Sequence, residues 1–136
     1  MHAPVALLWL SDVEEEEWFR DALGVGGFVS EVVRNEDELM SRALELRPAV
    51  VVVDLDLPAG VAWPGVERLN GNHETCEIPV IGVSQHDHVL HARRLWNGGF
   101  CGFLRKSVGA AALLAAVRYC LTRTADGMQW VDLSGF

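Results

Sequence analysis

The strongest constraint on this chain is a repeated alternation of short apolar runs with longer segments of helical period. The five runs are rich in Val, Ile, Leu and Phe, and they lie at residues 5–10, 28–33, 49–53, 78–83 and 100–104. Runs of this length bounded by turn residues are typical of strands. Regular alternation of strand and helix predicts an α/β fold with a doubly wound parallel sheet. The uninterrupted run 49–53 predicts a central strand that is covered on both faces.

The segments between these runs predict five helices. We expect them at residues 13–23, 36–47, 64–70, 88–97 and 108–122. Four glutamates open the first helix, where acidic groups favour the positive end of the helix dipole, and Trp18 falls on its apolar face. Asn35 is the predicted cap of the second helix, with Glu38 completing a capping box, and Ser107 is the predicted cap of the fifth.

Charge and length limit the functions open to the chain. Its 136 residues fit one domain, and 11 Lys and Arg against 19 Asp and Glu give a net charge of −8. The basic residues are scattered, which argues against direct nucleic-acid contact. No apolar stretch is long enough to span a membrane, and the amino terminus lacks a signal-peptide pattern, so a cytoplasmic location is expected. The three cysteines show no metal-site spacing and are expected to be reduced thiols.

Polar residues follow several of the predicted strands. Asp12 follows the first, Asp54 and Asp56 the third, Ser84 the fourth and Lys106 the fifth. Ligands bind outside the carboxyl ends of strands in open parallel sheets, so these side chains should form one site. Carboxylates of Asp12 and Asp54 suit Mg²⁺, and Asp54 has the chemistry of a nucleophile that accepts a phosphoryl group. Lys106 would neutralise developing charge and Ser84 would donate a hydrogen bond.

Four segments carry a family resemblance, and they are residues 7–12, 51–58, 78–84 and 98–106. In register from about residue 5 to 122, the chain resembles the receiver domain of two-component response regulators. The resemblance implies a flavodoxin-like (βα)5 fold with strand order 2-1-3-4-5, and phosphorylation of Asp54 by a histidine kinase or phosphotransfer protein. It implies a Mg²⁺ site formed by Asp12, Asp54 and the main-chain carbonyl of Asp56. Ser84 and Phe103 would form the switch, with Lys106 at the phosphoryl site. It also implies that the chain is no enzyme beyond self-phosphorylation and slow autodephosphorylation.

One departure from the family pattern concerns the acidic pair after the first strand. Ser11 stands where the family carries the first of two adjacent acids, so Mg²⁺ binding should be weaker. This leaves a second hypothesis open: the chain is a pseudo-receiver that serves as a phosphorylation-independent interaction or dimerisation module.

The end of the chain suggests how a signal would be passed on. Residues 1–123 are expected to form the receiver-like domain and residues 124–136 a linker or tail, which weakly resembles that of NarL/FixJ-type regulators. The DNA-binding output domain of such regulators is not present in this sequence. A homodimer is expected through the face formed by the fourth helix, fifth strand and fifth helix, including Trp96, Phe103 and the alanines of residues 110–116.

Overall fold

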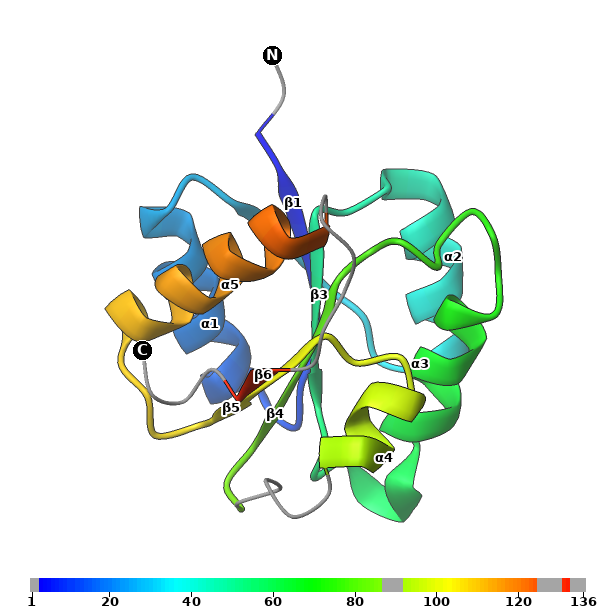
Figure 1. Cartoon of the computed structure of the whole chain (residues 1–136). Coiled ribbons are helices and arrows are strands. Elements are labelled where there is room, and N and C mark those ends of the chain that lie inside the picture. The colour runs from blue at the N-terminus through cyan, green and yellow to red at the C-terminus, as the bar shows by residue number, and fades with distance from the viewer. Residues whose placement is uncertain (1–2, 87–91, 125–130, 133–136) are drawn as a thin grey trace.

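The computed structural model describes residues 3–86, 92–124 and 131–132 and contains one parallel sheet (Figure 1). The sheet order is β2-β1-β3-β4-β5-β6, which confirms the predicted order 2-1-3-4-5 for the first five strands. The strands are β1 Val5–Trp9, β2 Val29–Val32, β3 Val50–Asp54, β4 Val80–Ser84, β5 Gly102–Arg105 and β6 Val131–Asp132. β6 was not predicted: it lies in the expected tail and pairs in parallel with β5.

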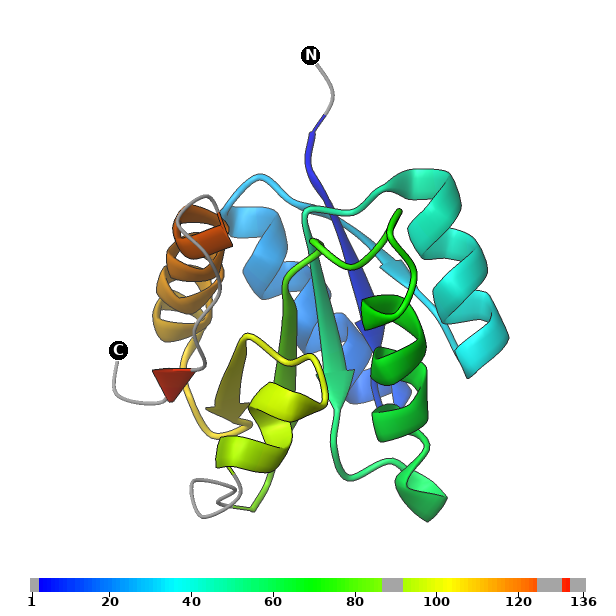
Figure 2. The ribbon, with the colours of Figure 1, turned by 45° about the vertical axis from the view of Figure 1, so that its right-hand side comes forward.

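Helices cover both faces of the sheet (Figures 1 and 2). They are α1 Val13–Val25, α2 Glu36–Leu46, α3 Ala62–Asn70, α4 Ala92–Asn97 and α5 Ala110–Thr124, with a 3-10 turn at Pro58–Gly60. α1 and α5 lie on one face, and α2, α3 and α4 lie on the other. Alternate residues of β3 enter the two layers: Val50 and Val52 pack toward α1 and α5, and Val51 and Val53 toward the opposite helices. None of the helices in the described part of the chain is long and apolar enough to cross a membrane.

The first two helices begin with the same pattern of side-chain caps. Asp12 accepts a hydrogen bond from the Glu15 amide at 2.9 Å, and Asn35 accepts one from the Glu38 amide at 2.9 Å. The glutamate three residues after each cap reaches back to the amide that precedes the cap: Glu15 to Ser11 and Glu38 to Arg34. The predicted cap at Asn35 is therefore confirmed, and α1 uses the same device.

Several predicted helix details were wrong. α3 begins at Ala62 rather than Pro64, because a proline in the first helical turn needs no amide partner. α5 begins at Ala110, too late for Ser107 to cap it, since the Val108 amide instead closes a turn on the Arg105 carbonyl. Of the predicted fourth helix, residues 87–91 lie outside the described residues. Trp18 is 39% exposed, and its neighbour Phe19 takes the buried position on α1.

Candidate functional site

Asp54 is the last residue of β3, and its side chain is fully buried at the carboxyl edge of the sheet. Three donors surround its carboxylate. Oδ2 accepts hydrogen bonds from the Ser11 hydroxyl and from Lys106 Nζ, the latter at 2.7 Å. Oδ1 accepts one from the Asp56 amide at 2.7 Å. A buried carboxylate is stable only when it is paired and hydrogen-bonded, and these contacts meet both needs.

Lys106 follows β5 directly and joins that strand to β3 and α1. Its ammonium group lies 2.6 Å from Glu15 Oε1 and 3.9 Å from Asp56 Oδ2, in addition to its contact with Asp54. Burial alone would lower the pKa of Lys106, but the hydrogen bonds to Asp54 and Glu15 outweigh it and raise the pKa above its ordinary value of 10.5. Lys106 is thus held as a cation between two carboxylates.

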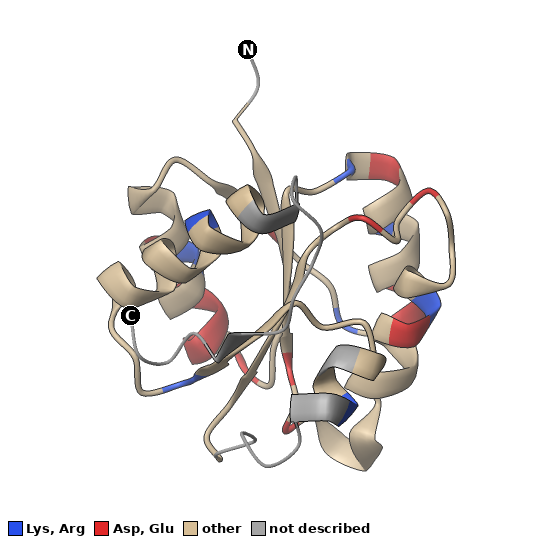
Figure 3. Ribbon diagram, viewed as in Figure 1, with Lys and Arg blue, Asp and Glu red and all other residues tan. Residues whose placement is uncertain are grey.

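Sequence reasoning missed Glu15. It treated the four glutamates of α1 as a solvated helix start, and Figure 3 shows the acidic first turn of this helix in red. Helix geometry places the third residue after the Asp12 cap back beside the residues that precede the helix, which was the available signal. Its carboxylate therefore spans the Ser11 amide, at 3.2 Å, and Lys106.

Ser84 and Asp56 form a second linked pair at the same edge. The Ser84 hydroxyl donates to Asp56 Oδ1 at 2.7 Å and accepts a hydrogen bond from the His86 amide at 3.0 Å. The Gln85 amide donates to Asp56 Oδ2 at 2.9 Å. Burial tends to raise the pKa of Asp56, but these two hydrogen bonds to the carboxylate and the nearby charges of Lys106 and His86 lower it below 3.8.

The remaining predicted residues lie at different depths. Asp12 is exposed, and one of its carboxylate oxygens caps α1. Phe103 is fully buried in the same apolar cluster as Leu95 and Phe100, on the face that carries α4. The Phe103 side chain has no exposed area, so the expectation that it forms part of a dimer surface was wrong.

The donor chemistry of the site bears on the expected Mg²⁺. Asp12 and Asp54 carry the hard oxygens that Mg²⁺ prefers. In the described ranges, however, no three His, Cys, Asp or Glu side chains gather as a metal-binding group. Ser11 also supplies a hydroxyl where a carboxylate would add charge. This donor set fits a Mg²⁺ ion that keeps most of its water ligands.

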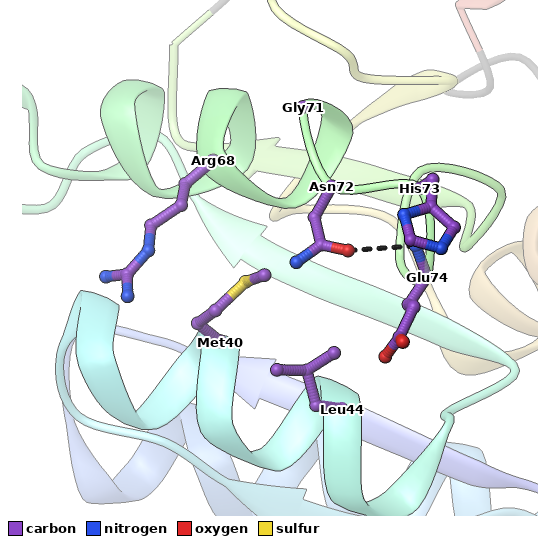
Figure 4. Close-up of a pocket in the computed structure, with 7 residues that line it drawn as sticks. All are labelled: Met40, Leu44, Arg68, Gly71, Asn72, His73 and Glu74. Carbon is purple, nitrogen blue, oxygen red and sulfur yellow. Dashed lines mark hydrogen bonds between the residues drawn. The ribbon is translucent and has the colours of Figure 1, made fainter.

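Two hollows differ in their relation to Asp54. One, of about 200 Å³, is lined by Glu15, Trp18, Phe19, Gln85 and Lys106, so it opens beside the site. The other, of about 700 Å³, lies between α2 and α3 and is shown in Figure 4. Its walls include Met40, Leu44 and Arg68, and no residue of the Asp54 cluster lines it. The first hollow therefore lies beside Glu15 and Lys106 of the candidate site.

Comparisons with known proteins find transcriptional regulators and response regulators among the relatives of this chain. The transcriptional activator protein ExaE of Pseudomonas putida is 29% identical over 98 residues, which cover 72% of this chain and 45% of that protein. The polar-differentiation response regulator DivK of Brucella anthropi is 25% identical over 100 residues, which cover 74% of this chain and 81% of that protein. The chain spans about half the length of the first curated relatives it matches. No family model matches it.

Solved structures share the same fold. The structure of a putative response regulator from Chloroflexus aurantiacus superposes with a TM-score of 0.80 at 18% identity, covering 90% of this chain and 100% of that one. At this identity the structural likeness shows the fold alone.

Proposed function

We propose that the chain is a receiver domain of the two-component response-regulator type and that Asp54 is its phosphoryl acceptor. The observation that carries the proposal is the contact of Lys106 Nζ with Asp54 Oδ2 at 2.7 Å, at the end of β3. The pair places a nucleophilic oxygen and a fixed positive charge at one point. The response regulators among the relatives do not favour the alternative of a phosphorylation-independent module.

The chemistry proposed at Asp54 is a single displacement at phosphorus. A carboxylate oxygen of Asp54 attacks the phosphorus of a donor such as acetyl phosphate, a P–O bond forms, and the bond to the acetate oxygen breaks. The ammonium group of Lys106 then neutralises charge on the transferred group. A receiver is not an enzyme in the usual sense, and slow hydrolysis of the acyl phosphate would return Asp54 to its starting state.

Ser11 controls access to this oxygen. Its hydroxyl donates to Asp54 Oδ2, while the residue itself is exposed to solvent. Rotation of a surface serine has a low cost, so an incoming phosphodonor can displace this hydrogen bond without unfolding the site. The same hydroxyl is then free to donate to a phosphoryl oxygen.

Mg²⁺ has a limited part in this proposal. Asp12, Asp54 and the main-chain carbonyl of Asp56 would hold it, weakly, because Ser11 adds no negative charge. When bound, it supplies positive charge to the phosphoryl oxygens. Asp12 would also have to share its carboxylate with the cap of α1.

The switch proposed for this chain begins at Ser84. Its hydroxyl now donates to Asp56, 2.7 Å away, and transfer of that hydrogen bond to a phosphoryl group would move the end of β4. Phe103 on the neighbouring strand is paired with Gly82 and is already buried. Ser84 would thus carry the signal from Asp54 toward β5 and α5.

The partners follow from the family. A histidine kinase or phosphotransfer protein would supply the phosphoryl group. Residues 1–123 would form the receiver unit. The proposal also includes a cytoplasmic location. The relative ExaE is named a transcriptional activator protein, so the proposal includes an output that regulates transcription through a separate DNA-binding domain. Homodimerisation at the surface of α5 would pass the signal on.

Intact mass after incubation with acetyl phosphate tests the acceptor. Wild type should gain one phosphoryl group, more at millimolar Mg²⁺ than without it, and Asp54→Asn should gain none. Asp21→Asn is the matched control, since Asp21 is an exposed aspartate on α1 and should leave labelling intact. Equal labelling of Asp54→Asn, or no labelling of wild type beside a competent receiver, would overturn the assignment.

A further inference from the structure

Two of the three cysteines meet inside the domain. Cys101 lies directly before β5 and Cys120 lies on α5, and both are free and buried in the apolar cluster between the sheet and α1 and α5. Their sulfur atoms are 3.2 Å apart. Isolated buried cysteines usually serve as small apolar residues, but this pair has its sulfurs in direct contact across two elements.

We propose that Cys101 and Cys120 form a redox-modification site: a peroxide converts the pair into a disulfide that fastens α5 to the start of β5. A disulfide requires a sulfur separation of about 2.0 Å. The sulfurs, now 3.2 Å apart, therefore need to approach by roughly 1 Å for the bond to form. The proposal is independent of phosphoryl transfer at Asp54.

The pKa values of the two thiols are shifted in opposite directions. Cys101 donates a hydrogen bond to Cys120, and this contact outweighs the effect of burial, which raises the pKa, so that the pKa of Cys120 lies below its ordinary value. The same contact, together with burial, raises the pKa of Cys101. Cys120 thus forms the thiolate more readily, and the thiolate is the nucleophile in reactions with peroxides.

The reaction balances with hydrogen peroxide as the oxidant. The Cys120 thiolate attacks one peroxide oxygen, the O–O bond breaks, and a sulfenic acid and water result once a proton is taken up. The Cys101 sulfur then attacks the Cys120 sulfur, the S–S bond forms, and a second water leaves. Both cysteines are oxidised and one peroxide is reduced.

The bond would constrain the segment that links the sheet to α5. Residues 101 and 120 are 19 positions apart, and Phe103 and Lys106 lie between them. Closing this loop removes conformations from the unfolded chain and holds the two ends of the β5–α5 unit together. Oxidation should therefore restrict the movement of α5 relative to β5.

Thiol counting after peroxide treatment tests the proposal. The oxidised wild type, unfolded and alkylated, should carry one alkyl group instead of three, weigh two hydrogens less before alkylation, and yield a peptide that joins residues 101 and 120. Its unfolding temperature should rise on the order of 10 °C and return on reduction.

Cysteine variants separate this pair from the third thiol. Cys76 is half-buried, and its sulfur faces the His73 carbonyl at 3.6 Å, so Cys76→Ser should form the disulfide as wild type does. Cys101→Ser and Cys120→Ser should each lose it and show no rise in unfolding temperature. Peptide mapping of wild type decides the matter even where a variant folds poorly. Three alkylated thiols after oxidation, a dimer linked through Cys76, or stable oxygen addition at Cys120 without an S–S bond would each overturn the proposal.

Discussion

At the scale of single residues, Asp54 is a fully buried carboxylate whose stability depends on its neighbours. Lys106 is also largely buried, with 10% of its side chain exposed. Removing one member of a buried ion pair leaves the other charge uncompensated, which costs more than the net contribution of the pair. The contacts that stabilise the buried Asp54 carboxylate are therefore the same contacts that would govern the proposed phosphoryl transfer.

We expect Lys106→Met to lower the free energy of unfolding by about 3 kcal/mol, because Asp54 loses its counter-charge. Adding Asp54→Asn to that variant should recover at least about 1 kcal/mol of the loss, since the uncompensated charge is removed. Urea unfolding of the four proteins in this cycle gives both values. Arg68→Met is the control: Arg68 pairs with Glu36 and Asp37 at the surface, where ion pairs contribute little, and its loss should lower the free energy of unfolding far less than Lys106→Met does. Strictly additive costs would contradict the coupling.

Ser11 gives a second prediction at this scale. Ser11→Asp should tighten Mg²⁺ binding on the order of tenfold, because a hard divalent cation responds to the number of anionic oxygens around it. Calorimetric titration with Mg²⁺ measures the change. Ser11→Ala removes the hydroxyl that contacts Asp54 without adding charge, so its affinity should stay near that of wild type. If Ser11→Asp binds no more tightly than Ser11→Ala, the carboxylates of this edge do not form the metal site.

At the scale of elements, the sequence predicted strands better than helix ends. Apolar runs identified all five main strands because a buried parallel strand must be apolar along its length, as in the valines of β3. Helix starts depend on single side-chain contacts, so Asn35 was predictable from its spacing to Glu38, while the later start of α5 follows from a turn at Val108 that no motif marks. Trp18 was misplaced because a helix with two adjacent aromatics can bury only one of them on a narrow face.

The packing of α3 on β1 leads to a prediction at this scale. A Cβ atom at Gly65 would lie 2.6 Å from the ring of the buried Trp9, so Gly65→Ala should destabilise the domain by about 1–3 kcal/mol. Gly24 lies in α1 with nothing near its missing Cβ, and Gly24→Ala should stabilise by about 0.5–1 kcal/mol. Thermal or urea unfolding compares them. Two alanine variants that shift stability in the same direction would show that the contact with Trp9 does not limit this position.

At the scale of the whole molecule, parallel topology explains why the site could be predicted in outline. All carboxyl ends of β1, β3, β4 and β5 meet at one edge, so polar residues near those ends had to converge. Which side chains within that cluster form hydrogen bonds and ion pairs with one another could not be predicted from the sequence. The Ser84 hydroxyl donates to Asp56 rather than to Asp54, and Lys106 also binds Glu15. Both contacts depend on side-chain positions at the level of single ångströms.

The sixth strand changes what can associate through this side of the molecule. β6 pairs with β5 through Gly102 and Phe103, so it covers the edge that would otherwise accept a strand from another copy. The exposed side of α5 remains, with Ala110 and Ala111 open to solvent and Ala112 and Ala115 half-buried. Small side chains let two helices approach closely, which favours a two-fold contact of α5 with α5. The side chain of Trp96, also predicted at this surface, lies outside the described residues.

We expect the protein to form a homodimer at micromolar concentration, and Ala111→Glu to shift it to the monomer, because the substitution places two like charges across the two-fold axis. A receiver that directs a DNA-binding output benefits from this symmetry, since paired half-sites need paired domains. Analytical ultracentrifugation measures the assembly directly. Ser41→Glu adds the same charge to an exposed position of α2, on the opposite face of the sheet, and should leave the dimer intact. A wild type that sediments as a monomer, or a dimer insensitive to Ala111→Glu, would exclude the α5 surface as the interface.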